Sequence, residues 1–293
     1  MILLFYNFLF RLKVYFNFLK FRLSLFVALS SGFGYSFAVG KCNWDFFNFI
    51  ILLVGGFCIS GSSISLNQII ENNYDKIMHR TLLRPIPSNQ LYLLESIIFT
   101  IIINIFGLLL LLFYTNILTT FLSFVSMVMY SFIYTPLKRL SPISIFIGGL
   151  PGALPPLIGW LSVTNSISNE IFVIFILQFI WQFPHFWSIA WKSNYDYNLV
   201  GFRLLPNKGR KDFYTSIYIM VYSIVLIPFI LLPILIGVVE FNFLIISILY
   251  GFLFFNQTFF LIKNHSKRLV MKVMFGSFLY LPVMQIIFFL DRI

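Results

Sequence analysis

Three oxygen-bearing side chains follow one another at four-residue intervals in the sequence, at Asn67, Glu71 and Asp75. In an α-helix, residues spaced by four lie on the same face, about one turn apart. Amide and carboxylate oxygens are the ligands that a hard cation such as Mg²⁺ prefers, often together with substrate phosphates. The spacing therefore predicts that these three residues bind Mg²⁺. A solvated loop whose acids balance its bases is the alternative.

Polar residues gather again in two later segments, at 134–139 and 181–203, at the ends of apolar stretches. Together the three segments offer oxygen ligands for a metal, cations for phosphates, and aromatic rings for a carbocation. These groups are what the ionisation of an allylic diphosphate requires, with an apolar cavity for the isoprenoid tail. Beyond the first motif, the candidates are Asp196 as a further metal ligand, Tyr134 and Lys192 as catalytic residues, and Arg80, Arg84, Lys138 and Arg139 as diphosphate-binding bases.

The composition places these residues in a membrane protein. Hydrophobic residues make up 60% of the chain and charged residues 10%, whereas soluble proteins have about 25% charged residues. We expect an all-α polytopic membrane protein whose 293 residues form a single domain. The recurring apolar segments predict nine membrane-spanning helices, at about 23–40, 46–69, 93–113, 116–134, 143–162, 170–190, 214–237, 241–262 and 271–290.

Prolines help to set these boundaries. Pro85, Pro136, Pro142, Pro184 and Pro206 are expected mostly to end spans, because proline breaks helices. The Gly- and Pro-rich stretch 148–156 is expected to interrupt the fifth span. Its small residues favour either close helix packing or a kink that opens a cavity.

The Lys and Arg residues predict the orientation. With a cytoplasmic N-terminus, eighteen of the twenty lie in cytoplasmic segments, and only Lys41 and Arg292 lie outside. This distribution follows the positive-inside rule and places every candidate loop in the cytoplasm and the C-terminus outside. The net charge of +11 is thereby explained by topology, without a nucleic-acid partner.

The first 22 residues alternate aromatic and basic side chains. This pattern is typical of a basic amphipathic segment lying at the cytoplasmic membrane interface. Neither a cleavage site for a secretory signal nor a transit peptide is evident, which favours the inner membrane of a bacterium.

Four stretches carry a resemblance to a known family. They are Leu66-Asn67-Gln68 through Glu71 and Asp75 to Arg84-Pro85; Tyr134 to Arg139; Trp181-Gln182-Phe183-Pro184-His185-Phe186 through Lys192 and Asp196 to Leu205-Pro206; and Ser277 to Pro282. The chain resembles the intramembrane prenyltransferases of the UbiA type from about Lys20 to Asp291. Within them it is most similar to the protoheme IX farnesyltransferase (haem O synthase) branch, and the Trp181–Phe186 stretch is the most branch-specific part.

The resemblance implies nine helices around a cavity open to lipid, with a cytoplasmic cap of loops. It implies farnesyl transfer from farnesyl diphosphate to a vinyl group of haem b, followed by water addition, giving haem O and diphosphate. It also implies that His185 lies at the haem, where it would ligate or orient the iron or move a proton. A buried histidine hydrogen-bonded to a neighbouring helix is the alternative. A haem A synthase or a terminal oxidase is the implied assembly partner.

The chain departs from the family pattern at three places, the least consequential of which is Phe21, where a proline often follows the residue at Lys20. Glu71 stands where an Asp is usual, and the second motif has Lys192 and Asp196 where two acids four residues apart are usual. Two other functions stay open. One is prenylation of an aromatic or quinone precursor, which the single acid disfavours. The other is haem transport, although transporters place their ionisable groups near the bilayer midplane.

Overall fold

The computed structural model describes residues 2–40, 44–207, 209–237, 240 and 244–292, with side chains from Leu9 onward. Lys41 and Lys208 of the charge pattern lie outside these residues. Nine helices within the described ranges are long and apolar enough to cross a membrane, which confirms the predicted number of spans. They are Phe21–Val39 (α2), Phe46–Ile70 (α3), Leu93–Tyr114 (α5), Ile117–Leu140 (α6, η1 and α7), Ser144–Thr164 (α8), Asn169–Lys192 (α9), Phe213–Leu235 (α11 and α12), Leu244–Lys263 (α13) and Lys267–Leu290 (α14).

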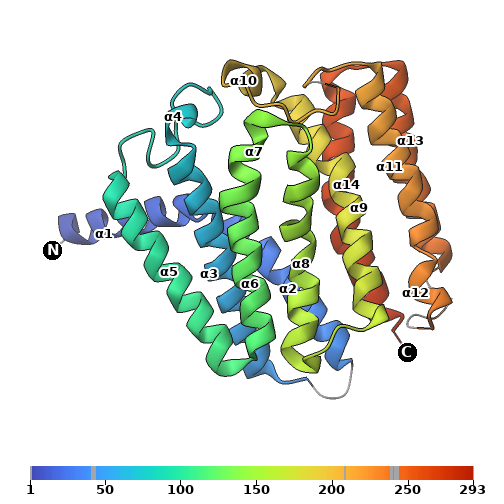
Figure 1. The fold of residues 1–293 in the computed structure, drawn as a ribbon, viewed down its shortest axis with the longest axis horizontal. Coiled ribbons are helices and arrows are strands. Elements are labelled where there is room, and N and C mark those ends of the chain that lie inside the picture. Colours follow the sequence, from blue (N-terminus) through green and yellow to red (C-terminus); the bar gives the residue numbers. More distant parts are fainter. Residues whose placement is uncertain (1, 41–43, 208, 238–239, 241–243, 293) are drawn as a thin grey trace.

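The spans form one helical bundle with a cap at one end (Figure 1). The cap contains the short helices α4 (Asn72–Asp75), α7 (Thr135–Leu140) and α10 (Asn194–Leu199), together with the loops around them. The fourth span also contains α6 (Ile117–Val128) and a π-helical segment, η1 (Met129–Tyr134), and the seventh consists of α11 (Phe213–Phe229) and α12 (Leu232–Leu235). The chain therefore brings segments that are far apart in sequence together at the capped end.

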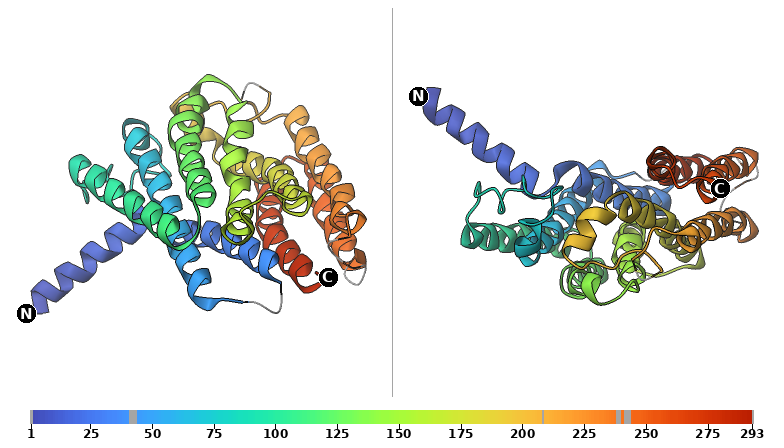
Figure 2. Two further views of the ribbon diagram at one scale, coloured as in Figure 1. Left: turned by 60° about the horizontal axis from the view of Figure 1, so that its bottom comes forward. Right: turned by 90° about the horizontal axis from the view of Figure 1, so that it is seen from above.

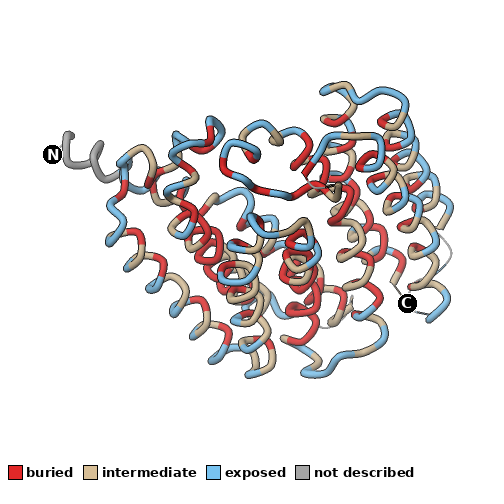
Figure 3. Tube along the Cα trace, turned by 45° about the horizontal axis from the view of Figure 1, so that its top comes forward, coloured by how far each residue is buried: buried red, intermediate tan, exposed pale blue. Residues whose placement is uncertain are grey.

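Burial separates the central helices from the outer ones (Figure 3). In α8, 78% of the most apolar window is buried inside the protein, against 22% in α5 and 28% in α13. The outer faces of α5 and α13 expose large apolar side chains such as Phe113 and Ile245, as helices in contact with lipid do.

Close packing explains the Gly- and Pro-rich fifth span. The helix α8 continues through Pro151, Pro155 and Pro156 from Ser144 to Thr164. A Cβ atom added at Gly159 would lie 1.8 Å from the carbonyl oxygen of Ser31 in α2. The expected interruption is therefore absent between those bounds, and the small residues let the α2 and α8 backbones approach each other.

Two prolines do not end spans as expected. Pro184 lies inside α9, and Pro136 lies in the first turn of α7, so the fourth span continues to Leu140 instead of ending near 134. Proline is tolerated in membrane helices because neighbouring groups satisfy the freed backbone carbonyls, and the first turn of a helix needs no N–H donor there.

The N-terminal helix α1 (Ile2–Phe18) projects sideways from the bundle (Figure 2). Arg11 of α1 donates a hydrogen bond to Glu95 at the start of α5, over 3.1 Å. A short connection at residues 19–20 joins α1 to α2. The assignment of α1 to the membrane interface stays a prediction.

Candidate active site

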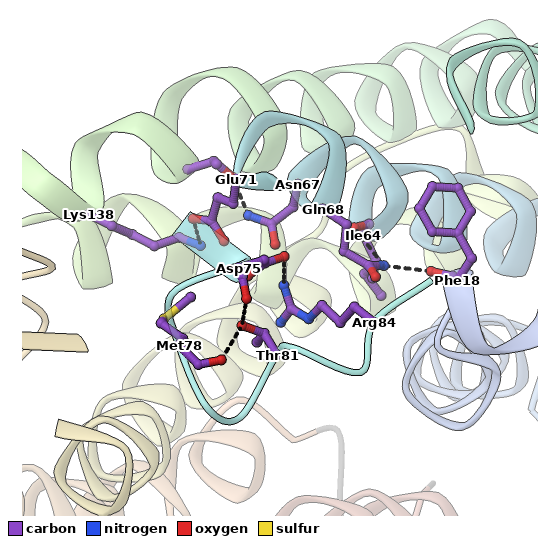
Figure 4. A network of polar contacts seen from close by, with 11 residues as sticks. Phe18, Ile64, Asn67, Gln68, Glu71, Asp75, Met78, Thr81, Arg84 and Lys138 are labelled. Carbon is purple, nitrogen blue, oxygen red and sulfur yellow. Dashed lines mark hydrogen bonds and ion pairs between the residues drawn. The ribbon is translucent and has the colours of Figure 1, made fainter. Parts of the chain in front are cut away.

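Asn67, Glu71 and Asp75 lie on one helical face, as their spacing predicts. The backbone N–H of Glu71 donates to the Asn67 carbonyl over 2.9 Å, and that of Asp75 donates to the Glu71 carbonyl over 2.9 Å. The helical path thus continues from α3 through α4. All three side chains are buried, with Asp75 fully inaccessible, and Figure 4 shows them close together.

Each of the two acids holds a base from another segment. The Lys138 Nζ atom of α7 lies 2.6 Å from Glu71 Oε1, and an Arg84 guanidinium nitrogen lies 2.5 Å from Asp75 Oδ2. The Thr81 hydroxyl also donates to the Asp75 backbone carbonyl over 2.9 Å. Burial raises the pKa of Asp75, while Arg84 acts in the opposite direction. These two ion pairs fix predicted diphosphate-binding bases beside the predicted metal ligands.

These oxygen atoms fit a Mg²⁺ ion that is bound partly by the protein and partly by substrate phosphates. Asp75 Oδ1 is buried and has no hydrogen-bond partner. The Asn67 amide nitrogen donates to the Thr135 hydroxyl over 2.9 Å. Within the described residues, no three His, Cys, Asp or Glu side chains are grouped closely enough to hold a metal by themselves. Mg²⁺ usually takes one or two carboxylates and completes its shell with phosphates and water, so the orphaned Asp75 oxygen matches such a site.

A π-helical segment positions Tyr134. The Thr135 hydroxyl donates to the Tyr130 carbonyl over 2.9 Å, five residues back in the chain, while it accepts the hydrogen bond from Asn67. Lys138 Nζ lies 4.8 Å from the centroid of the Tyr134 ring. Such π-segments occur frequently at functional sites, and this one links the fourth span directly to the acidic motif.

Asp196 joins the two largest cap loops. Its Oδ2 atom accepts a hydrogen bond from the Arg80 backbone N–H over 3.1 Å. The Arg80 guanidinium lies 5.1 Å from the centroid of the Tyr197 ring, the next residue in α10. The structure thus brings Asp196 and Arg80 together, and α10 lies against the loop that follows the acids.

Two predicted bases, Arg139 and Lys192, do not form ion pairs with Glu71 or Asp75. Arg139 donates to the Tyr74 hydroxyl over 2.5 Å and lines a cavity of about 640 Å³, together with Glu71 and Arg203. Lys192 is exposed at the end of α9. Diphosphate binding by Arg139 and a catalytic role for Lys192 stay predictions.

His185 lies within the sixth span, in contact with the ninth. Its Nδ1 atom is 2.9 Å from the Ser277 hydroxyl, and its ring stacks on Trp181 with centroids 4.9 Å apart. The Trp181 indole N–H donates to the Ser277 carbonyl over 2.7 Å. The third and fourth stretches of the sequence resemblance therefore meet at one point between α9 and α14. A hydrogen bond to a neighbouring helix is present, and the role of His185 at haem stays a prediction.

Sequence reasoning missed two residues of this region. Thr135 lies within a quoted motif but carries no charge to mark it. The charge pattern explains Lys20 only as a topological charge, yet Lys20 is close to Arg84, Arg80 and Lys138 of the site. Burial, followed by the nearby Arg84, Arg80 and Lys138, lowers the pKa of Lys20 to about 7. Its position immediately before the first span was the available signal.

The bundle and its capped acid–base site define a multi-pass membrane enzyme of the prenyltransferase class. The chain belongs to the UbiA prenyltransferase family, whose model matches residues 24–281. It is 45% identical to a protoheme IX farnesyltransferase of Cytophaga hutchinsonii, over 96% of this chain and 98% of that protein. It is 32% identical to a protein of the same name from Solibacter usitatus, over 96% of this chain and 99% of that protein.

Solved structures of distant relatives share the fold. A digeranylgeranylglyceryl phosphate synthase structure superimposes with a TM-score of 0.78 at 17% identity, covering 96% of this chain and 98% of that chain. A UbiA homologue from Archaeoglobus fulgidus bound to DMAPP and Mg²⁺ superimposes with a TM-score of 0.68 at 13% identity, covering 94% of this chain and 98% of that chain. These likenesses confirm the all-α architecture.

Proposed function

We propose that this membrane prenyltransferase transfers the farnesyl group of farnesyl diphosphate to a vinyl group of haem b. Water adds to the resulting cation, and the products are haem O and diphosphate. The observation that carries the choice of haem as acceptor is the 45% identity to the Cytophaga hutchinsonii protein over nearly the whole chain. The two buried acid–base pairs support the choice of a diphosphate donor.

The bases of the cap bind the donor. Arg84 and Lys138 are held in place by Asp75 and Glu71, and Arg80 lies on the same loop as Arg84. Guanidinium and ammonium groups form short, charge-assisted hydrogen bonds with phosphate oxygens. Because both pairs are largely shielded from water, their charges act on the leaving diphosphate with little screening.

Mg²⁺ is the proposed cofactor. Asp75, through its orphaned Oδ1 atom, would hold it together with Asn67 and Glu71. Asp196 of α10, which accepts from the Arg80 N–H, is the further proposed ligand. When bound, Mg²⁺ supplies positive charge that neutralises the departing diphosphate. Removal of divalent cations by a chelator is therefore expected to stop turnover, and added Mg²⁺ is expected to restore it.

Aromatic rings stabilise the allylic cation. Lys138 Nζ lies 4.8 Å from the Tyr134 centroid and 5.7 Å from the Phe202 centroid, so both rings are close to a position where positive charge already resides. The negative face of an aromatic ring attracts a cation, and the attraction is stronger away from water. We assign to Tyr134 the stabilisation of the farnesyl cation while it reacts with the vinyl group.

Haem O in membranes of an expressing cell tests the proposal. The gene is expressed in a bacterial strain that lacks haem O, and the extracted haems are separated by chromatography and weighed by mass spectrometry. Farnesylated haem is expected with the wild-type protein and absent with the Asp75→Asn variant. Unmodified haem together with a prenylated aromatic acid would favour the quinone-type reaction and refute the haem acceptor.

Placement in the cell completes the proposal. The N-terminus and cap are assigned to the cytoplasm of a bacterial inner membrane and the C-terminus to the outer side. A haem A synthase or a terminal oxidase is the proposed neighbour, since either would receive haem O. Co-purification of a tagged chain with either enzyme, and its absence with an unrelated tagged membrane protein, would support this assignment.

A further inference from the structure

Lys20 has a backbone conformation that is unusual for its residue type. Among the non-glycine residues that the structure describes, three have positive φ: Lys20 at 46°, Asn89 at 57° and Asn165 at 51°. Asparagine adopts the left-handed region several times more readily than most residues, whereas lysine has no such preference. The surroundings of Lys20 must therefore impose this conformation, and such outliers cluster at ligand sites.

The connection between α1 and α2 is fastened to the helix that carries the acids. The Phe18 carbonyl accepts a hydrogen bond from the Gln68 side-chain amide over 2.6 Å (Figure 4). It also accepts one from the Ser65 hydroxyl over 3.4 Å. Phe18 is fully buried. The Ser24 hydroxyl closes the turn from the other side by donating to the Leu19 carbonyl over 2.6 Å. Gln68 directly follows Asn67, so the anchor of this turn belongs to the acidic motif itself.

The charges that face Lys20 are mostly positive. They are Arg80 and Arg84 from the loop after α4, Lys138 from α7 and Asp75 from α4. Glu71 and Asp75 each already hold one base, Lys138 and Arg84 respectively. Among the described residues, neither Lys20 nor Arg80 forms a salt bridge with an acid. This excess of positive charge beside two buried ion pairs is the environment that a polyvalent anion would stabilise.

We propose that Lys20 binds the diphosphate of the prenyl donor. In this proposal Gln68 is a positioning residue: it holds the α1–α2 turn so that the Lys20 ammonium group reaches the diphosphate. The inference rests on the proposed function for the identity of the donor. It makes the N-terminal helix part of the substrate site, because the left-handed turn at Lys20 sets both the direction of α1 and the position of the ammonium group.

Glycine at position 20 separates the two possible roles of this residue. Glycine adopts a φ of 46° without strain, so Lys20→Gly keeps the turn and removes only the charge. The Lys20→Arg variant keeps the charge. Lys13→Met is the matched control, since Lys13 is an exposed lysine on the adjoining helix. The readout is the affinity of the purified, detergent-solubilised protein for inorganic pyrophosphate in the presence of Mg²⁺, measured by calorimetry.

Lys20→Gly is expected to weaken pyrophosphate binding and to raise the KM for farnesyl diphosphate, each by at least about tenfold, the scale of one charge-assisted hydrogen bond. Lys20→Arg should retain most of the affinity, and Lys13→Met should equal the wild type. Wild-type affinity in Lys20→Gly would overturn the proposal. It would show that position 20 contributes only its backbone turn and that the ammonium group does not bind the diphosphate.

The role of Gln68 is tested by combining variants. Gln68→Leu removes the hydrogen bond to the Phe18 carbonyl and is expected to weaken pyrophosphate binding in the wild-type background. It should add little in the Lys20→Gly background, because Gln68 acts through Lys20. Equal losses in both backgrounds would refute the positioning role.

The outcomes also separate this inference from the proposed function. Pyrophosphate binding needs no acceptor. A wild-type protein that binds pyrophosphate through Lys20 but leaves haem unmodified would refute only the haem acceptor. Normal haem farnesylation and pyrophosphate binding in Lys20→Gly would refute only the role of Lys20.

Discussion

At the scale of a single residue, the two carboxylate oxygens of Asp75 have different surroundings. One carboxylate oxygen holds Arg84, and the other is buried with no hydrogen-bond partner. An unpaired buried oxygen is unfavourable unless a ligand satisfies it, so the arrangement is explained if a cation completes it. The same carboxylate therefore links the position of a base, through Oδ2, to the proposed binding of a metal, through Oδ1.

Replacement of Asp75 by Asn is expected to reduce kcat/KM by at least about a hundredfold, the scale of a lost electrostatic contact with the reacting charges. The variant keeps the side-chain volume but removes the charge that holds Arg84. Asp212→Asn is the matched control, because Asp212 caps α11 by accepting from the Thr215 N–H, and Asn caps helices equally well. Turnover is measured in membranes containing equal amounts of each protein. Normal turnover by Asp75→Asn would contradict the metal-site assignment.

The pH dependence of diphosphate binding follows from Lys20. Its pKa lies near 7 in the ligand-free protein, against an ordinary value of 10.5. A bound anion favours the charged ammonium and raises that pKa, so binding takes up a proton above pH 7. Affinity for pyrophosphate is therefore expected to fall between pH 7 and 9, by at most about tenfold per pH unit. The Lys20→Gly variant should show a flatter profile, and since pyrophosphate titrates identically in both experiments, identical slopes would contradict the prediction.

The same pKa has a consequence for folding. Because the folded-state pKa of Lys20 is depressed, the unfolded chain binds more protons between about pH 7 and 10.5. The contribution of Lys20 to the stability of the ligand-free protein accordingly rises with pH through that window. Ligand binding and the stability of the ligand-free protein should therefore respond to pH in opposite directions.

At the scale of elements, the Glu71–Lys138 pair connects the end of α3 to α7. The two side chains are 5% and 8% exposed, so the pair is buried, whereas the Arg11–Glu95 pair on α1 and α5 is 50% and 28% exposed. A buried charge that loses its partner is strongly destabilising, but removal of both charges is often nearly neutral. The pair thus serves to fix the register of two cap elements more than to add net stability.

A double-mutant cycle tests this connection. Lys138→Met is expected to lower the free energy of unfolding by about 3–5 kcal/mol, and Glu71→Gln with Lys138→Met should recover most of that loss. Arg11→Met, the exposed counterpart, should cost less than about 1 kcal/mol. Unfolding is followed by heat or denaturant in detergent, with turnover measured in parallel. Turnover should remain lost in the double variant, since the base proposed to bind the diphosphate is absent. An additive double variant would show that the two side chains act independently.

Hydropathy predicts the nine spans because the apolar length needed to cross a bilayer dominates the energetics of each segment. The continuation of the fourth span through Pro136 was not predictable, since it depends on a π-turn that Thr135 stabilises by binding Asn67. Within the site, the acids were found because a four-residue spacing is a local property of a helix. Lys20 was not found, because its approach depends on hydrogen bonds from Gln68, 48 residues later in the chain.

At the scale of the whole molecule, the two ends of the bundle carry different charged groups. The cap carries the acids and bases of the site, and the C-terminal end lies at the opposite end of the bundle (Figure 1). At that far end, Arg292 lies 4.8 Å from the Phe37 ring centroid and 5.6 Å from that of Trp160, which shields its charge against aromatic faces. The fold thus brings basic loops that the sequence assigns to the cytoplasm to the same end as the proposed diphosphate site. A water-soluble diphosphate headgroup would then enter from the cytoplasm, while the isoprenoid tail lies among the spans.

Single cysteines test this orientation in a variant from which Cys42 and Cys58 have been removed. Lys76 and Lys211 are exposed in cap loops, and Ser166 is exposed in the connection between α8 and α9 at the other end. In intact bacterial cells, a membrane-impermeant maleimide is expected to label Ser166→Cys and to leave Lys76→Cys and Lys211→Cys unlabelled until the membrane is opened. The physical reason is that Lys and Arg near span ends are retained on the cytoplasmic side during insertion. Labelling of Lys76→Cys and Lys211→Cys in intact cells, with protection of Ser166→Cys, would invert the topology and place the diphosphate site outside the cell membrane.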